Sequence, residues 1–278
     1  MKLLRFMAAT VLLAATLRAQ VDLVAVNVNI PFPTVQAVAG QTVTVNTFII
    51  PLGAVPANFS YTYDLRFTID FVVTASDPFV VSYTSTTFGN ATHVVQIPLD
   101  IEPGPLWCIA LDIHPSPGET NLSNNAVTGT QLVISPLYPG TQEDFELRTS
   151  IDGLPLTTGA VQTGSAGGTY TINVRSPNGA FSGHPFVLGA ELWVPPTPPF
   201  AIAGYPYVWL DPLGSFIALN GFDPTSGVPP LSANGFSHTV PVPLGLGGVR
   251  VRLQAFTPSP SAANGILAAT DAHDLILP

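Results

Sequence analysis

Apolar and polar residues alternate one by one along much of this chain, and this period of two constrains the fold more than any other feature. The stretch 61–71 is the clearest case. Six aromatic or aliphatic residues occupy its odd positions, while threonine, aspartate and arginine occupy its even positions. Only an extended strand sends such alternating residues to opposite faces, so the stretch predicts a strand with one face in a core.

Similar runs, separated by proline, glycine, asparagine and aspartate, recur along the chain. The predicted strands are 21–30, 42–50, 61–71, 79–83, 92–99, 106–113, 126–134, 145–151, 168–175, 186–194, 205–210, 215–219, 236–242, 248–256 and 274–277. In the run at 249–255 we expect Val249, Val251, Leu253 and Ala255 to face inward and Arg250, Arg252 and Gln254 to face outward. The 29 prolines and 24 glycines leave little room for long helices.

The number and spacing of these runs predict an all-β protein made of two antiparallel β-sandwich domains. About seven strands at 20–134 are typical of an immunoglobulin-like sandwich. The stretch 135–143, with two prolines and a glycine, is the expected linker. Strand patterns resume after it, and 144–278 is the expected second sandwich, which could also be a jelly roll.

The first 19 residues have the form of a secretory signal. Lys2 and Arg5 precede or flank a short apolar run at 6–17, and small residues precede Gln20. The run is shorter than the roughly 20 apolar residues that a membrane helix needs. We therefore expect cleavage after Ala19, export to the medium or the cell envelope, and no membrane insertion of the mature chain.

Charge and residue usage exclude several kinds of chemistry. The expected mature chain has five arginines, no lysine and 17 acidic residues, a net charge of −12. Such a chain would repel a phosphate backbone, so we expect no nucleic-acid partner. Schiff-base chemistry is excluded because the only lysine is Lys2. The single cysteine, Cys108, is expected to be a small buried residue.

Known catalytic motifs are absent from the sequence. It has no HExxH zinc motif, no GxSxG elbow, no GxGxxG nucleotide loop and no EF-hand loop. The isolated histidines His93, His114, His184 and His238 are best interpreted as ordinary strand or turn residues. We therefore expect no enzymatic activity and no organic cofactor.

Three stretches of the first half carry a resemblance to a known family. They are Val-Asp-Leu-Val at 21–24, Gly-Gln-Thr-Val-Thr-Val at 40–45, and the stretch 111–125 with its Leu-Asp, acidic loop and paired asparagines. On these motifs, residues 21–134 resemble the bacterial cell-adhesion-related domain, CARDB. The resemblance implies an immunoglobulin-like extracellular module that acts in adhesion or display. At Leu122-Ser123 the chain differs from the family, which commonly has another acid there.

The second half is similar to a carboxy-terminal region of secreted planctomycete-type proteins. The motifs that carry this similarity lie at 143–149, 176–181, 240–243, 249–254 and 264–265. The similarity implies a secreted bacterial protein and no particular activity.

Two groups of residues are candidate metal ligands. Asp112, Glu119, Asn124 and Asn125 offer the oxygen atoms that Ca²⁺ prefers, since Ca²⁺ takes roughly six to eight oxygen ligands. The same residue types also cap turns through their own backbone, which is the alternative interpretation. In the second group, Asp271, His273 and Asp274, adjacent strand positions face opposite ways, so one ion could bind all three only at a bend.

Tyr205, Tyr207 and Trp209 are the candidate ligand-binding aromatics. On a strand they would share one face, and a row of rings could stack against sugars. A row of this kind is also a common feature of a core.

These observations favour a secreted or cell-envelope structural and interaction protein, with an envelope protein or a glycan as its partner. One alternative is a non-catalytic carbohydrate-binding protein. The other is an extracellular hydrolase whose site follows no familiar motif.

Overall fold

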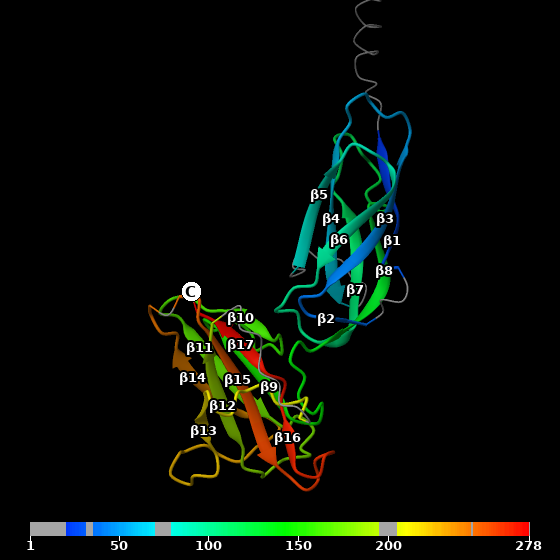
Figure 1. The fold of residues 1–278 in the computed structure, drawn as a ribbon. Coiled ribbons are helices and arrows are strands. Elements are labelled where there is room, and N and C mark those ends of the chain that lie inside the picture. The colour runs from blue at the N-terminus through cyan, green and yellow to red at the C-terminus, as the bar shows by residue number, and fades with distance from the viewer. Residues whose placement is uncertain (1–20, 32–35, 70–78, 195–204, 246, 278) are drawn as a thin grey trace, which may run out of the picture. The chain divides into compact units, whose positions relative to one another are not determined.

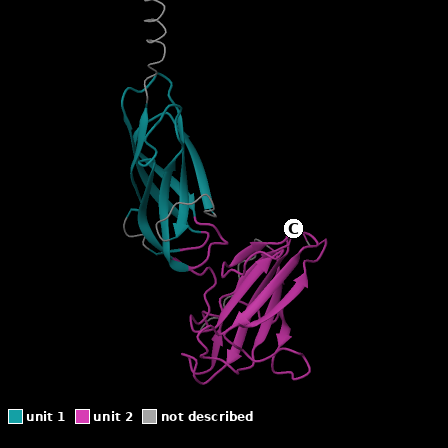
Figure 2. Ribbon diagram, turned by 180° about the vertical axis from the view of Figure 1, so that it is seen from behind, with its two compact units in different colours: residues 1–37, 41–96, 104–133 teal, residues 38–40, 97–103, 134–278 magenta. Residues whose placement is uncertain are grey.

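A computed structural model describes residues 21–31, 36–69, 79–194, 205–245 and 247–277 of the chain. These residues form 17 strands and no helix, which confirms the expected all-β class. The strands make four sheets in two compact units (Figures 1 and 2). As far as they are described, unit 1 comprises residues 1–37, 41–96 and 104–133, and unit 2 comprises residues 38–40, 97–103 and 134–278.

The expected signal segment, 1–19, lies outside the described residues. Within them, no helix has the length and apolarity of a bilayer-crossing segment.

Unit 1 is built mainly from a three-stranded sheet in the order β1-β3-β6 and a five-stranded sheet in the order β2-β8-β7-β4-β5. The pairs of β3 with β1 and β6, and of β4 with β5 and β7, are antiparallel. The strands are β1 (Asp22–Asn29), β2 (Gln36–Val38), β3 (Thr42–Leu52), β4 (Tyr61–Ile69), β5 (Phe79–Ser85), β6 (Gly89–Gln96), β7 (Gly104–Ile113) and β8 (Ala126–Ser135).

The core of unit 1 follows the predicted alternation. Alternate residues of β4, from Tyr61 to Phe67, are at most 5% exposed. Cys108 of β7 is fully buried, as expected, and its Sγ donates to the carbonyl oxygen of Thr68 at 3.6 Å. Two polar residues on the opposite face of β4, Asp64 and Thr68, are also buried. Both faces of this central strand are therefore covered.

The strands β1 and β8 approach each other at a glycine. The amide of Ile30 donates to Thr130 Oγ1 at 3.3 Å. A Cβ atom on Gly129 would lie 1.8 Å from the carbonyl oxygen of Val28. Because no side chain fits at that distance, the approach of the two strands requires glycine at this position.

Unit 2 is a sandwich of a six-stranded and a three-stranded sheet. The larger sheet has the order β10-β17-β15-β12-β13 with β16 paired to β15, and the smaller has the order β14-β11-β9. Its pairs are antiparallel except for β10 and β17, which are parallel. The strands are β9 (Glu146–Ile151), β10 (Val161–Thr163), β11 (Thr169–Arg175), β12 (Val187–Trp193), β13 (Ser215–Asn220), β14 (Phe236–Pro241), β15 (Arg250–Pro258), β16 (Leu267–Ala269) and β17 (His273–Ile276).

The core of unit 2 lies between these sheets. It combines apolar residues of β9 and β11, including Tyr170, with those of β12, β15 and β17, including Leu188, and with Phe186 just before β12. On β15, Leu253 and Ala255 face this core, as expected. Arg252 and Gln254 on the other face are 1% and 0% exposed, so the prediction that they face solvent is wrong. A second layer of chain covers that face.

The covering layer includes the stretch predicted as a linker. Residues 135–143 belong to unit 2, and Tyr138 is buried in a small apolar cluster with Ala160, Val161 and Ala272. A Cβ atom on Gly140 would lie 2.2 Å from the carbonyl oxygen of Ala269, which shows how closely this stretch follows the sheet.

The prediction of a strand at 205–210 is wrong. Residues 206 and 207 form a turn, in which the amide of Val208 donates to the carbonyl oxygen of Tyr205 at 3.0 Å. Pro206 fixes its own φ and has no amide hydrogen, which favours a turn over a ladder position. Three strands of only three residues each, β2, β10 and β16, were too short to give a periodic signal.

Candidate functional site

The predicted oxygen cluster of unit 1 is divided among internal partners. Asp112 Oδ2 lies 3.0 Å from the guanidinium of Arg66. The two carboxylate oxygens of Glu119 accept hydrogen bonds from the amides of Leu23 and Ser116, at 2.9 and 2.7 Å. The bond to Ser116 lies within the loop, as the turn-capping interpretation expects, whereas the bond to Leu23 fastens the loop to β1.

The paired asparagines hold the same region together. Asn124 donates to Asp22 Oδ1 at 3.1 Å, and Asn125 donates to the carbonyl oxygen of Ile113 at 3.4 Å. The side-chain oxygens of both asparagines are buried and have no hydrogen-bond partner. Within the described ranges, no three His, Cys, Asp or Glu side chains are grouped as a metal site. Calcium binding by these residues stays a prediction.

Asp271, His273 and Asp274 have different partners, and His273 and Asp274 lie on opposite faces of β17 (His273–Ile276), as the alternation of a strand requires. His273 lies between the sheets, with Nδ1 2.9 Å from Thr149 Oγ1. Asp274 lies on the opposite face, where both carboxylate oxygens accept hydrogen bonds from Arg252 at 2.8 Å. Asp271 accepts from the amide of Gly140 at 2.8 Å. The three side chains therefore do not form one site.

Arg252 is a fully buried cation on the outer face of the six-stranded sheet. Its guanidinium carbon lies 4.1 Å from the ring centre of Tyr138 and 4.9 Å from that of Trp193. Burial, and to a lesser degree the nearby Asp274 carboxylate, raises the pKa of the Tyr138 hydroxyl to about 12, so this phenol stays neutral. A bidentate carboxylate and two aromatic rings stabilise the charge of Arg252 away from water.

The three predicted binding aromatics do not share one face. Trp209 Nε1 donates to the carbonyl oxygen of Pro139 at 2.8 Å, and its ring lies 5.5 Å from that of Tyr138. Trp209 therefore belongs to the covering layer. Tyr205 and Tyr207 form an edge-to-face pair with ring centres 5.9 Å apart. The platform of three rings, expected from a strand at 205–210, is therefore not formed.

Tyr207 also lines a hollow of about 400 Å³, together with Asn264 and several residues of the covering layer. The amide of Asn264 is already occupied, because its oxygen accepts from the backbone amides of Ile266 and Leu267 and its nitrogen donates to the carbonyl oxygen of Leu267. Asn264 therefore has little remaining capacity to form hydrogen bonds with a ligand in this hollow.

A charged cluster that the sequence did not predict lies on the outer face of β4. Asp64 accepts hydrogen bonds from Arg66, Ser82 and His114 at 2.8, 2.6 and 2.9 Å. Burial alone would raise the pKa of Asp64, but the hydrogen bonds from His114 and Ser82 outweigh it and hold the pKa below its ordinary value. The other ring nitrogen of His114 lies 2.9 Å from Thr62 Oγ1.

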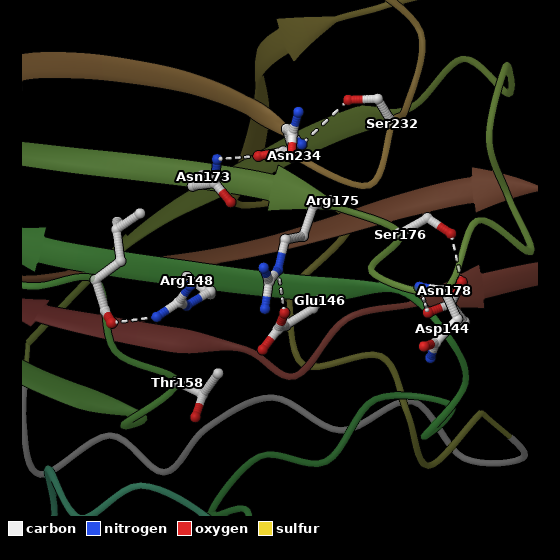
Figure 3. Close-up of polar contacts among 12 residues, drawn as sticks. Asp144, Glu146, Arg148, Thr158, Asn173, Arg175, Ser176, Asn178, Ser232 and Asn234 are labelled. Carbon is white, nitrogen blue, oxygen red and sulfur yellow. Dashed lines mark hydrogen bonds and ion pairs between the residues drawn. The ribbon is translucent and has the colours of Figure 1, made fainter.

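Polar contacts on the outer face of β9 and β11 are also internal (Figure 3). Arg175 forms an ion pair with Glu146, and Arg148 donates to the carbonyl oxygen of Leu156 at 2.6 Å. Beside them, Asp144 accepts from the hydroxyl of Ser176 at 2.6 Å and from the amides at 178 and 180, each at 2.7 Å. These contacts hold a turn, and they occupy the charged groups of this face.

The outer face of the β1-β3-β6 sheet is different, because it carries a group of neutral polar side chains with few hydrogen bonds inside the protein. A hollow of about 270 Å³ lies on it. Its side chains come from alternate positions of the three strands, and we call this set the amide face: Asn27, Asn29, Asn46, Phe48, Asn90 and Thr92. The strand register places Asn29, Asn46 and Thr92 in one row and Asn27, Phe48 and Asn90 in the next.

Few of these groups are satisfied within the protein. Thr92 Oγ1 donates to Asn46 Oδ1 at 3.0 Å. The side-chain oxygen of Asn29 is buried and has no hydrogen-bond partner. The sequence showed Asn27 and Asn29 on one side of a strand, but only the register brings them beside residues some 20 and 60 positions away.

Comparison with known proteins adds little. No protein-family model and no curated protein matches the chain. Among solved structures, the chain is similar to a crystal structure of a Salmonella alpha-2-macroglobulin variant, with 13% sequence identity and a TM-score of 0.26. The match covers 93% of this chain but 15% of that protein's chain. Values this low do not establish a common family.

Proposed function

We propose that the mature chain is exported and acts in the cell envelope or the medium as a non-catalytic interaction protein, with a role in adhesion as the CARDB resemblance implies. One contrast supports this function. The acidic residues of the two predicted metal sites have partners inside the chain, as Asp274 has Arg252 and Glu119 has two backbone amides. The hollow on the β1-β3-β6 sheet, in contrast, is lined by neutral amides. Neutral amides bind ligands but do not activate nucleophiles.

The test uses the mature chain, residues 20–278, and envelopes prepared from the bacterium that encodes it. We expect the protein to sediment with the envelopes and to release no sugar or acid from a panel of polysaccharides and esters. A chain that stays entirely in the supernatant would contradict the proposal. Turnover of any substrate in the panel would contradict its non-catalytic part.

A hydrolase is the second candidate, because of one arrangement. Thr62 Oγ1, the ring of His114 and Asp64 Oδ2 form a chain with 2.9 Å at each contact. This is the hydroxyl–imidazole–carboxylate order of nucleophilic hydrolases. However, Asp64 also accepts from Arg66 and Ser82, which fits a structural ion-pair cluster. If Thr62→Ala abolished an observed turnover while Ser82→Ala did not, the hydrolase would replace the interaction protein.

A further inference from the structure

The amide face combines an aromatic ring with asparagines on both neighbouring strands and at the preceding position of the same face of β3. Phe48 lies at the centre of its row, because β3 is the middle strand, with Asn27 opposite it on β1 and Asn90 opposite it on β6. Phe48 is half-buried, whereas Asn27 and Asn90 are exposed. The ring is therefore more shielded from solvent than the two amides that flank it.

The amides have unused hydrogen-bonding capacity. The side chains of Asn27 and Asn90 make no hydrogen bond within the part of the chain that the structure describes, and Asn29 Oδ1 is an orphaned acceptor. Each asparagine has two N–H donors and a carbonyl acceptor on one planar group. A ligand with adjacent hydroxyl groups, each both a donor and an acceptor, would match these groups in pairs.

Charge and size restrict the ligand further. The residues that line the hollow carry no charge, and the mature chain as a whole has a net charge of −12. An anionic ligand would be repelled without any local cation to hold it. The volume of about 270 Å³ is just below the roughly 300–1,000 Å³ of pockets that enclose drug-sized molecules. It fits a short part of a longer ligand.

We propose that the amide face is a binding site for neutral carbohydrate, with the apolar face of one sugar ring on Phe48 and its hydroxyl groups hydrogen-bonded to the flanking asparagines. Stacking on an aromatic ring contributes apolar contact with a defined geometry. This inference rests on the proposed interaction function and names its ligand class. It places the carbohydrate site in unit 1, and not at the tyrosines of unit 2.

The experiment is electrophoresis of the mature chain, produced without glycosylation, in native gels that contain a soluble polysaccharide. The neutral probes are laminarin, dextran, mannan and galactomannan, and the anionic probe is alginate. We expect retardation by at least one neutral probe and none by alginate. Titration calorimetry with the retarding probe then compares variants.

Two variants remove different parts of the site. Asn46→Ala with Phe48→Ala removes the centre, and Asn27→Ala with Asn90→Ala removes exposed amides alone, so that folding is not at risk. Each lost neutral hydrogen bond should weaken binding about fivefold. Thr44→Ala is the matched control, because Thr44 is exposed on the same face of β3 two residues from Asn46, outside the hollow, and it should bind as the unaltered chain does.

Two results would overturn the inference: no retardation by any neutral probe, or equal binding by the Asn27→Ala, Asn90→Ala variant and the unaltered chain. In either case, sedimentation with envelopes would leave the proposed interaction function standing. Conversely, turnover of a substrate in the panel would contradict the non-catalytic part of the proposed function. It would leave the carbohydrate binding measured in the native gels unchanged.

Discussion

At the scale of single residues, the buried His273 is expected to make the stability of unit 2 depend on pH. It is 1% exposed, and its Nε2 atom is buried with no hydrogen-bond partner. Burial lowers the pKa of His273 from 6.5 to about 3. Between these values the unfolded chain binds a proton that the folded chain does not, so stability falls as the pH falls from 6.5 toward 3.

We therefore predict that His273→Gln makes the stability of unit 2 less sensitive to acid. A full difference in protonation at this residue is worth about 1.4 kcal/mol per pH unit. Urea unfolding of both proteins at pH 6.5 and 4.5, followed by tryptophan fluorescence, should show a loss roughly 2–3 kcal/mol larger in the unaltered chain. Burial raises the pKa of Asp271, which has the opposite effect on acid sensitivity, but both proteins keep this residue. Equal losses would mean that His273 becomes protonated without unfolding.

At the scale of strands, the close contact between β8 and β1 at Gly129 can be tested by substitution. A Cβ atom on Gly129 would meet the backbone of β1, whereas a Cβ atom on Gly104, at the start of β7, would meet nothing within 4 Å. We expect Gly129→Ala to lower the free energy of unfolding by about 2–3 kcal/mol, as overpacking does, and Gly104→Ala to leave it nearly unchanged. Thermal unfolding measures both. Similar melting temperatures for the two variants would show that β1 and β8 separate without cost.

The strands themselves were largely predictable because a period of two is a local property. The alternation assigned the core-facing residues correctly for β15 and for β4 from Tyr61 to Phe67, but Ile69 at the end of β4 is 44% exposed. It could not show that Arg252 is buried as well, because the chain that covers it lies more than 40 residues away at 205–211 and more than 100 away at 136–142. From sequence alone, a polar residue on the strand face away from the core is predicted to be exposed. That prediction fails where another segment of the chain covers the face.

The candidate site was less predictable than the strands for the same reason. Asn27 and Asn29 are visible as polar positions of one strand, yet the amide face exists only because two further strands lie beside them in one register. The predicted ligands Asp112 and Glu119 were the right residue types for a cation. Their actual partners, Arg66 and the amides of Leu23 and Ser116, depend on tertiary contacts that spacing does not reveal.

For the whole molecule, the excess of acidic over basic residues predicts that it does not bind nucleic acids. Residues 20–278, the expected mature chain, contain five arginines and no lysine. Arg66, Arg148, Arg175 and Arg252 are each bound to an acceptor within the chain, which leaves little to neutralise a phosphate backbone. We predict that the mature chain does not retard duplex DNA in a mobility-shift gel even at about 50 mM salt, where such binding is strongest. Retardation that disappears as salt is raised would contradict this prediction.

The position of Cys108 has a practical consequence. The chain has no other cysteine, and this one lies fully buried in unit 1. A thiol-reactive dye can therefore attach only while unit 1 is open, and unit 2 contributes no signal. The rate of labelling, measured across denaturant concentrations, would report the opening of one half of the molecule by itself, without an engineered probe.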